Sequence, residues 1–497
     1  MKYISTRGNF NKVEAAEAIR TGMVPTGGLF VPESIPEFNL EQINEMKDKS
    51  YQQITLNVIE KFLTDYSKEE LEESISAAYC DYNFPVDEVA PIVKLSDNLY
   101  ILELWHGPTA AFKDMALQLM PQLLVRAMKK LGTEKELVIL VATSGDTGKA
   151  ALEGFKDVEG VKIIVFYPAE GVSKIQEVQM TTTTGNNTSV VAVEGNFDDC
   201  QTGVKSIFAD QDFNRLINQN SYQFSSANSI NWGRLVPQIV YYFSTYAYLI
   251  KEKVIKIGDK INVSVPTGNF GNILAAYYAY RMGLPINKFI CASNDNKVLT
   301  DFLANGVYDA NRNFKRTMSP SMDILISSNL ERFLFEITGH NSEKINNWYS
   351  DLKENGKFEI DKQTLSDIKS IFVGDFALEE EARLTINDVF TDYNYTLDPH
   401  TAVGVNVYQK YRQQRNDATI TVVDSTANPY KFAEAVLESL SDIKCNTNEY
   451  QNLKKLQEIT GLEIHRALIN LDDKEVRHQR KCSSNQIREE ILNILAI

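Results

Sequence analysis

The chain has 497 residues, of which 43% are hydrophobic and 24% are charged, and its formal net charge at pH 7 is −15. This length and composition are typical of a globular protein with several domains. The excess of acidic residues argues against nucleic acid or an anionic membrane as a general partner, because the summed field repels both.

The cysteines, histidines and apolar segments narrow the class of protein further. The five cysteines form no CxxC pair, and the histidines show no HxH or HExxH spacing, so we predict neither a metal site nor a disulfide framework. The N-terminal residues lack an apolar signal segment, and no apolar stretch is long enough to span a membrane. We therefore expect a cytoplasmic protein with a small-molecule partner.

The first 97 residues differ in pattern from the rest of the chain. Glycines and prolines interrupt the beginning, at Gly27-Gly28, Pro32 and Pro36, and an acidic helical pattern follows at residues 66–78. We predict a separate N-terminal domain at residues 1–97.

From residue 98 onward, short β-branched runs alternate with amphipathic helical patterns. Runs of strand length occupy residues 137–142, 161–167, 189–193, 261–265, 289–292 and 418–423. This alternation is typical of an α/β fold with buried, largely parallel sheets. We expect a smaller α/β domain at residues 98–230 and a larger one at residues 231–497, with a helical insertion at about 341–396.

Lys113 follows a Gly107-Pro108 turn and an apolar flank that ends at Phe112, at the start of a helical pattern. The helix dipole disfavours a cation at that end, and the apolar flank removes water from the amine. Both effects favour the neutral amine that Schiff-base chemistry requires. Taken alone, however, an average lysine is a solvated surface residue.

Two glycine loops each follow a predicted strand and precede a predicted helix. They are TSGDTG at 143–148, before a helix expected from about Lys149, and PTGNFGN at 266–272, before a helix expected at 273–281. Backbone N–H groups at such a helix start bind carboxylates and phosphates, although a plain tight turn also explains each loop. A Walker A loop is excluded, because Thr143 replaces its first glycine and Ala150 its final Ser/Thr.

Asn228, Ser229 and Arg234 lie at the start of a further helical pattern. Their amide, hydroxyl and guanidinium donors suit a dianionic phosphate. On local grounds, a helix capped by Asn228 or Ser229 with a surface arginine is an equal alternative. Near the end of the chain, the run at 418–423 continues into DSTANPYKF at 424–432. His106 and His400 are interpreted as structural residues.

Together these segments resemble the threonine synthases, a family of fold-type II pyridoxal phosphate (PLP) enzymes. GPTAAFKD at 107–114 resembles the family's PLP-lysine motif HGPT-x-AFKD, and residues 228–234 match its N-S-x-N-x-x-R pattern. Residues 424–432 are similar to its S-T-A-H-P-x-K-F segment, with Asn428 where the family usually has His. The resemblance covers most of the chain, in family order, and is to the longer, yeast-like and enterobacterial-like branch.

The resemblance implies a tryptophan synthase β-like fold and the conversion of O-phospho-L-homoserine and water to L-threonine and phosphate. Lys113 would be the catalytic residue, and no metal is implied. The implied cofactor-binding residues are Lys113, Asp146, Gly268, Asn269, Phe270, Gly271, Asn272 and Thr426. The implied substrate-binding residues are Thr143, Ser144, Asp146, Thr147, Asn228, Ser229 and Arg234.

Two questions stay open at this point. Another fold-type II PLP lyase, such as threonine or serine dehydratase or phosphoserine lyase, would share Lys113 and both glycine loops, although the N-S-x-N-x-x-R pattern argues against it. The oligomeric state, monomer or dimer, has no signature in the sequence.

Overall fold

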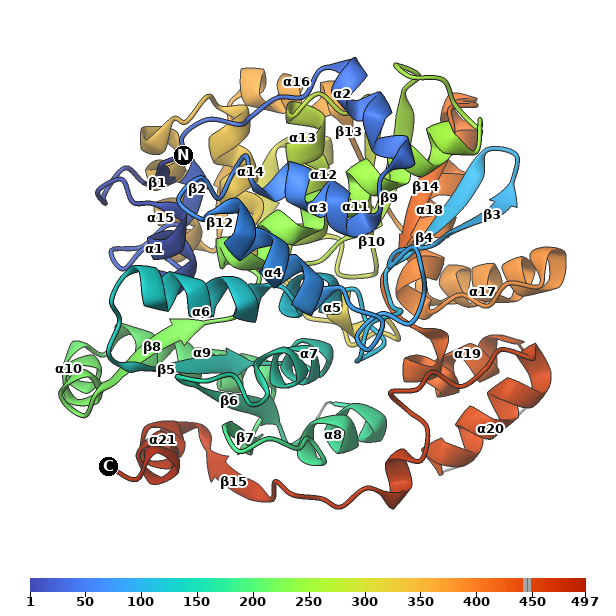
Figure 1. Ribbon diagram of the computed structural model, residues 1–497. Coiled ribbons are helices and arrows are strands. Elements are labelled where there is room, and N and C mark those ends of the chain that lie inside the picture. Colours follow the sequence, from blue (N-terminus) through green and yellow to red (C-terminus); the bar gives the residue numbers. More distant parts are fainter. Residues whose placement is uncertain (171, 441–444, 446–447) are drawn as a thin grey trace.

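A computed structural model describes residues 1–170, 172–440, 445 and 448–497, with the backbone alone at residues 197 and 198. Its body consists of two sheets in separate regions, each flanked by helices (Figure 1). In the described part of the chain, no helix has the length and apolar character needed to cross a membrane. The expected α/β fold is confirmed.

The larger sheet has six strands in the order β13-β10-β9-β14-β4-β3, and all neighbours are parallel except β3 and β4. Its strands are β3 (Ile92–Ser96), β4 (Leu99–Glu103), β9 (Ile261–Pro266), β10 (Ile286–Ser293), β13 (Phe372–Phe376) and β14 (Thr421–Ser425). The predicted runs at 261–265, 289–292 and 418–423 fall on β9, β10 and β14. The second glycine loop, at 266–272, therefore continues directly from β9, a buried parallel strand of this sheet.

The smaller sheet has five parallel strands in the order β15-β7-β6-β5-β8. These are β5 (Glu136–Ala142), β6 (Val161–Pro168), β7 (Thr188–Glu194), β8 (Tyr222–Ser226) and β15 (Arg480–Ser483). The three remaining predicted runs fall on β5, β6 and β7. Of the strands in the two sheets, β3, β4, β8, β13 and β15 were not recognised in the sequence.

Sheet membership differs from the predicted domain limits. β3 lies in the predicted N-terminal domain and β4 in the predicted smaller domain, yet both belong to the six-stranded sheet. β15, near the end of the chain, joins the five-stranded sheet. The predicted insertion at 341–396 is largely helical, but it also contains β13, an edge strand of the larger sheet. Pairing between strands hundreds of residues apart leaves no local pattern, which is why the limits based on composition missed it.

Helices complete the two regions. After the N-terminal strands β1 (Tyr3–Ser5) and β2 (Phe30–Pro32), the helices used below or visible in Figure 1 are α1 (Ala15–Thr21), α2 (Leu40–Glu45), α3 (Tyr51–Ile59), α4 (Lys68–Ala78), α5 (Asp114–Leu117), α6 (Met120–Lys130), α7 (Asp146–Phe155), α8 (Lys174–Thr181), α9 (Phe197–Ala209), α10 (Gln211–Gln219), α11 (Trp232–Lys251), α12 (Gly271–Arg281), α13 (Val298–Asn305), α14 (Leu330–Ile337), α15 (Ser342–Asn355), α16 (Lys362–Ile371), α17 (Glu379–Tyr393), α18 (Pro399–Arg415), α19 (Ala433–Leu440), α20 (Glu449–Thr460) and α21 (Ile487–Leu495). A short antiparallel pair, β11 (Val307–Asp309) and β12 (Lys357–Glu359), lies outside both sheets.

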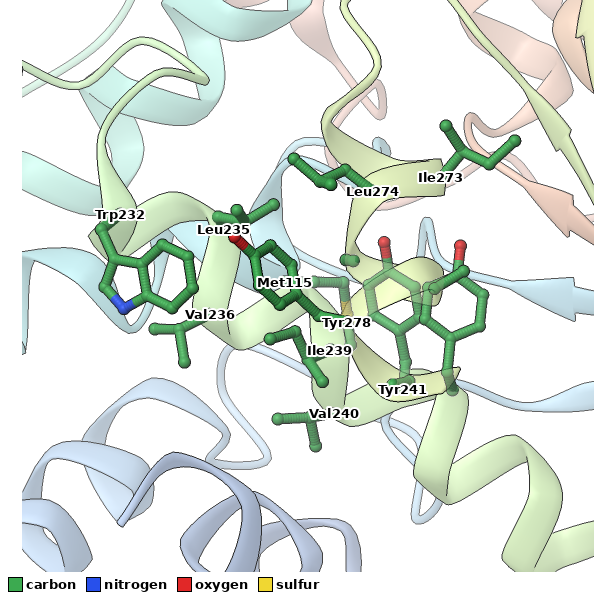
Figure 2. Close-up of a cluster of buried hydrophobic side chains, with 14 of the residues drawn as sticks. Met115, Trp232, Leu235, Val236, Ile239, Val240, Tyr241, Ile273, Leu274 and Tyr278 are labelled. Atoms are coloured by element: carbon green, nitrogen blue, oxygen red, sulfur yellow. The ribbon is translucent and has the colours of Figure 1, made fainter. Parts of the chain in front are cut away.

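A buried apolar cluster joins three of these helices (Figure 2). Met115 of α5 lies among side chains of α11 and α12, including Ile239 and Tyr278, and all three residues are fully buried. Interiors of this kind are close-packed, so their elements hold fixed relative positions. Since α5 follows Lys113 and α12 follows the second glycine loop, the cluster fixes the lysine relative to that loop.

Candidate active site

The turn that precedes Lys113 is held by Asp114. The N–H and hydroxyl of Thr109 both donate to the Asp114 carboxylate, at 2.8 and 2.7 Å. A Cβ atom on Gly107 would lie only 2.4 Å from that of Asp114, so the position requires glycine. Lys113 is the residue before α5, which confirms its expected place at a helix start.

Lys113 is 9% exposed, and its Nζ lies 3.6 Å from Asp146 Oδ2 and 3.4 Å from Ser321 Oγ. Burial lowers the pKa of the Lys113 amine; Asp146 acts in the opposite direction, while Lys431 and Arg234 lower the pKa further. The alternative that Lys113 is a solvated surface residue, like an average lysine, is therefore wrong. The site favours the neutral amine that attacks a carbonyl.

The Lys113 turn pairs with the segment after β14. Phe112 N–H donates to Thr426 O at 2.9 Å, and Asn428 N–H donates to Ala110 O at 3.0 Å. This places Thr426 beside the lysine, with a buried side chain whose hydroxyl bonds to none of the described residues. Asn428 caps the short 3₁₀ helix that follows it by accepting from Tyr430 N–H. The departure from the family's usual His thus has a local structural role.

The first glycine loop runs from β5 into α7, which begins at Asp146, three residues earlier than expected. The Thr143 hydroxyl accepts from the N–H groups of Gly145 and Gly148, and Thr143 is only 1% exposed, so this side chain shapes the loop. Ser144 and Thr147 are half-buried, and their hydroxyls bond to none of the described residues. These two hydroxyls are free to bind a carboxylate, whereas the predicted role of Thr143 in substrate binding stays a prediction.

The second glycine loop presents unused backbone donors. The N–H groups of Gly268, Asn269 and Phe270 donate to none of the described residues, and Phe270 adopts the left-handed conformation (φ +60°) just before α12. A Cβ on Gly268 would lie 2.8 Å from Ser321 O. A row of free N–H groups at a helix start can bind a phosphate, and we call residues 268–271 the cradle; its predicted contact with the cofactor stays a prediction.

Hydrogen bonds of the Asn272 side chain hold the end of this loop in place. Its amide oxygen accepts from the hydroxyls of Tyr241 and Tyr242, and its amide nitrogen donates to Asp424 at 2.9 Å. Burial raises the pKa of Asp424 to about 7, although bonds from Tyr242 and Asn272 act in the opposite direction. The Asn272 side chain therefore supports the cradle, and its predicted contact with the cofactor stays a prediction.

The predicted phosphate clamp lies at the start of α11. Asn231 caps this helix by accepting from Gly233 N–H at 2.8 Å, and Arg234 is 3% exposed. The alternative of a cap at Asn228 or Ser229 with a surface arginine is therefore wrong. The Asn228 side chain bonds to none of the described residues, and Ser229 Oγ lies 3.1 Å from Ser328 Oγ. Both side chains are left available to a ligand.

Several residues of the site were missed in the sequence because they lie in a loop without periodic pattern, at 319–329. Ser321 contacts Lys113, Ser327 donates to Gly268 O at 2.7 Å, and Ser328 donates to Asn269 at 3.2 Å. His400 supports this loop, since its Nε2 accepts from Ser321 N–H at 3.2 Å while Nδ1 bonds to Asp398. The structural role interpreted for His400 fits this position.

A cavity of about 540 Å³ opens beside Lys431, which shares the Asp146 carboxylate with Lys113; Lys113 itself and the second glycine loop do not line it. Ser144 and Gln176 line it from the smaller sheet, and Pro320, Lys431 and Phe432 line it from the larger one. Ser144 follows the carboxyl end of β5, and Lys431 follows that of β14. Ligands of open parallel sheets bind at such carboxyl ends, and this volume suits a cofactor or small substrate.

The residues present fit pyridoxal phosphate. The Gly268 loop offers donors for its phosphate, Lys113 offers its aldehyde an amine whose pKa burial lowers, and Thr426 offers a free hydroxyl within a buried setting.

Comparisons with known proteins agree with this geometry. Three family models match: Threonine synthase N terminus at residues 2–79, Pyridoxal-phosphate dependent enzyme at 84–345, and Threonine synthase, C-terminal at 401–478. Threonine synthase of Saccharomyces cerevisiae is 38% identical, with 88% of this chain and 89% of that protein covered. Threonine synthase-like 1 of Homo sapiens is 39% identical over 91% of this chain, and the match spans 62% of that protein's length.

Solved structures agree as well. The crystal structure of yeast threonine synthase has a TM-score of 0.88 and 34% identity, with 100% of this chain and 99% of that chain covered. The PLP-bound threonine synthase from Brucella melitensis has a TM-score of 0.87 and 35% identity, with 99% of each chain covered. The expected fold and cofactor are thereby confirmed. The matches extend from residue 2 to residue 478 and include both glycine loops and the Lys113 turn, so the chain belongs to the threonine synthase family of pyridoxal-phosphate-dependent enzymes.

Proposed function

We propose that this chain converts O-phospho-L-homoserine and water to L-threonine and phosphate. The observation that carries the proposal is the state of Arg234. Its guanidinium is buried, its Nε has no hydrogen-bond partner, and none of the described carboxylates pairs with it. Burial lowers the pKa of Arg234 to about 10. A buried cation without a counter-ion is costly unless a ligand supplies the negative charge.

Arg332 provides an internal contrast, because it is just as buried. Its three donor groups are all used, by Phe30 O at 2.9 Å, Asn329 Oδ1 at 2.7 Å and Ile230 O at 2.5 Å. Arg234, by comparison, has one acceptor among the residues that the structure describes, Ala227 O at 2.9 Å. We assign Arg332 to structure and Arg234 to the phosphate of the substrate.

Bound pyridoxal phosphate supplies an electron sink for negative charge at the substrate Cα. We assign Gly268, Asn269, Phe270 and Gly271 to its phosphate, and Thr426 to its pyridine nitrogen. A hydroxyl at that nitrogen, in place of a carboxylate, leaves the ring largely unprotonated and moderates the sink.

The remaining assignments follow from what each side chain can donate. Ser144 and Thr147 bind the substrate carboxylate with their free hydroxyls. The Lys113 amine takes the proton from the substrate Cα and later returns it. Asn228, Ser229 and Arg234 hold the γ-phosphate and stabilise the charge that grows on it as it leaves. Water then adds at Cβ.

We further propose that the partner is a small molecule and that the protein acts in the cytoplasm. The net charge of −15 supports the first point, since it disfavours anionic polymers and surfaces. Five cysteines without paired spacing support the second.

The test is phosphate release from O-phospho-L-homoserine, with threonine identified as the product, compared with O-phospho-L-serine, L-serine and L-threonine as substrates. We expect turnover of the first compound alone, and in Arg234→Gln a fall in kcat/KM of about 10²–10³-fold with the visible PLP absorbance unchanged. A wild-type protein that releases phosphate from phosphoserine, or ammonia from serine or threonine, at a higher kcat/KM is instead another lyase of this fold. Normal kinetics in Arg234→Gln would show that the phosphate site is wrongly assigned.

A further inference from the structure

A second lysine is buried next to Lys113. Lys431 lies on the 3₁₀ helix Pro429–Phe432, and its side chain is 0% exposed. Its Nζ lies 2.7 Å from Asp146 Oδ1 and 3.0 Å from Thr109 O. The other oxygen of Asp146 lies 3.6 Å from Lys113 Nζ. One carboxylate therefore lies between the amino groups of two lysines, and it joins the loop after β5 to the segment after β14.

Asp146 is held in its charged form. It is the first residue of α7, where the helix dipole favours an anion, and Gln176 donates to its Oδ1 at 2.9 Å. Burial by itself raises the pKa of the Asp146 carboxyl, but Lys431 and Lys113 outweigh it and hold that pKa well below its usual range.

A lone buried carboxylate would harm the chemistry of Lys113. An opposite charge within about 4–6 Å favours the charged form of an amine, and Schiff-base formation needs the neutral form. The charged groups that face Lys113 are Asp146 from α7, Lys431 from the 3₁₀ helix and Arg234 from α11. Asp114 and His400 lie one contact further away, bound to Thr109 and to Ser321. Lys431, in direct contact with Asp146, thus offsets the negative charge of Asp146 that would otherwise favour the charged form of Lys113.

We infer that Lys431 is a positioning residue that neutralises Asp146 and so keeps the Lys113 amine free to react with the cofactor. The inference rests on the proposed role of Lys113 in the reaction above. In the step concerned, the neutral amine adds to the aldehyde carbon of pyridoxal phosphate, a C=N bond forms, and the carbonyl oxygen leaves as water with the two amine protons. Neither Lys431 nor Asp146 gains or loses a proton.

The test measures the rate at which the cofactor-free full-length protein takes up pyridoxal phosphate between pH 6 and 10, followed by visible absorbance. In Lys431→Gln, the pH at half-maximal rate should rise by about one unit or more, which is about tenfold in rate near neutral pH. Asp146→Asn should move that pH downward, because Lys431 and Arg234 then face Lys113 without a carboxylate. The double variant Asp146→Asn/Lys431→Gln should return to within about threefold of wild type.

These opposite signs separate an electrostatic role from a structural one. An unchanged pH profile in Lys431→Gln would overturn the inference. A double variant as slow as Lys431→Gln would do so too, because it would mean that Lys431 acts by holding the Thr109 turn. If Lys431→Gln does not fold, Asp146→Asn provides the test instead. In that variant the pH at half-maximal uptake should fall, and an unchanged value would overturn the inference. Borohydride reduction and peptide mapping of the wild type show whether the cofactor is attached to Lys113, so failure of the proposed function is recognised separately.

Discussion

The two proposed phosphate sites would each bind a negatively charged phosphate, but with different kinds of donor. The cradle at Gly268–Gly271 offers uncharged backbone N–H groups at the start of α12, whereas the clamp at the start of α11 offers a buried guanidinium. Backbone donors cannot move or lose a proton, which suits a phosphate that stays bound. A cation without a protein counter-ion stabilises charge that develops on a leaving group. The difference predicts that damage to the cradle affects the cofactor and damage to the clamp affects the substrate.

The largest effect is expected from Gly268→Ala. The new Cβ would meet the backbone oxygen of Ser321 at 2.8 Å, so either the cradle or the 319–329 loop must shift. We expect the affinity for pyridoxal phosphate to fall about 100-fold, equivalent to about 2.7 kcal/mol, measured by titration of the cofactor-free protein. Gly27→Ala is the control for an added methyl group, because its Cβ meets nothing within 4 Å; Gly27 has a positive φ, which Gly268 does not, so any backbone strain falls on the control alone. A Gly268→Ala protein with wild-type cofactor affinity would contradict the cradle assignment.

A smaller effect is expected from Arg234→Lys, which retains a charge and loses the planar fork. We expect kcat/KM for O-phospho-L-homoserine to fall about 10–100-fold, because bidentate contact with phosphate is lost. Cofactor affinity should stay within about twofold of wild type. Equal losses in kcat/KM and in cofactor affinity would mean that the clamp and the cradle act as one site, contrary to the difference proposed between them.

Next in size is a pH effect at Asp424, which supports the cradle through Asn272. Burial raises the pKa of Asp424 in the folded protein to about 7, well above the ordinary value of an aspartate. Its stabilising contribution is therefore complete below about pH 4 and is lost as the pH rises through 7. Asp424→Asn removes this loss, so the free energy of unfolding of the variant relative to wild type should rise between about pH 4 and 7 by up to about 1.4 kcal/mol per pH unit, and should stay level above pH 7. Urea unfolding at four pH values measures it, and a pH-independent difference would contradict the pKa assignment.

The smallest effect is expected from Ser328→Ala. Ser328 Oγ lies between Ser229 of the clamp and Asn269 of the cradle, at 3.1 and 3.2 Å. Loss of one such hydrogen bond, about 0.5–1.5 kcal/mol, should raise KM for O-phospho-L-homoserine about 2–10-fold. In Ser327→Ala, by contrast, cofactor affinity should fall, because Ser327 holds Gly268 O. If Ser328→Ala instead lowers cofactor affinity and leaves KM unchanged, Ser328 supports the cradle alone.

Local sequence was informative wherever a residue's role depends on its chain neighbours. The strands β5, β9 and β14, the helix start at Lys113 and both glycine loops were predicted, since periodicity, turns and spacing are local properties. The sheet membership of β4 and β15 was not predicted, because both strands pair with strands far away in sequence. The start of α7 was placed three residues too late, because the Thr143 hydroxyl, rather than a recognisable cap residue, organises that turn.

The sequence by itself determined the α/β fold class, the family, and which lysine, loops and arginine form the candidate site. Only the tertiary structure decided that Arg234 is buried without a counter-ion, that Asn231 rather than Asn228 caps α11, and that the loop at 319–329 contacts Lys113. It also brought Lys431 within 2.7 Å of Asp146, 285 positions away in the chain. Burial, counter-ions and contacts between distant segments are properties of the packed chain, and they set the electrostatics on which the chemistry depends.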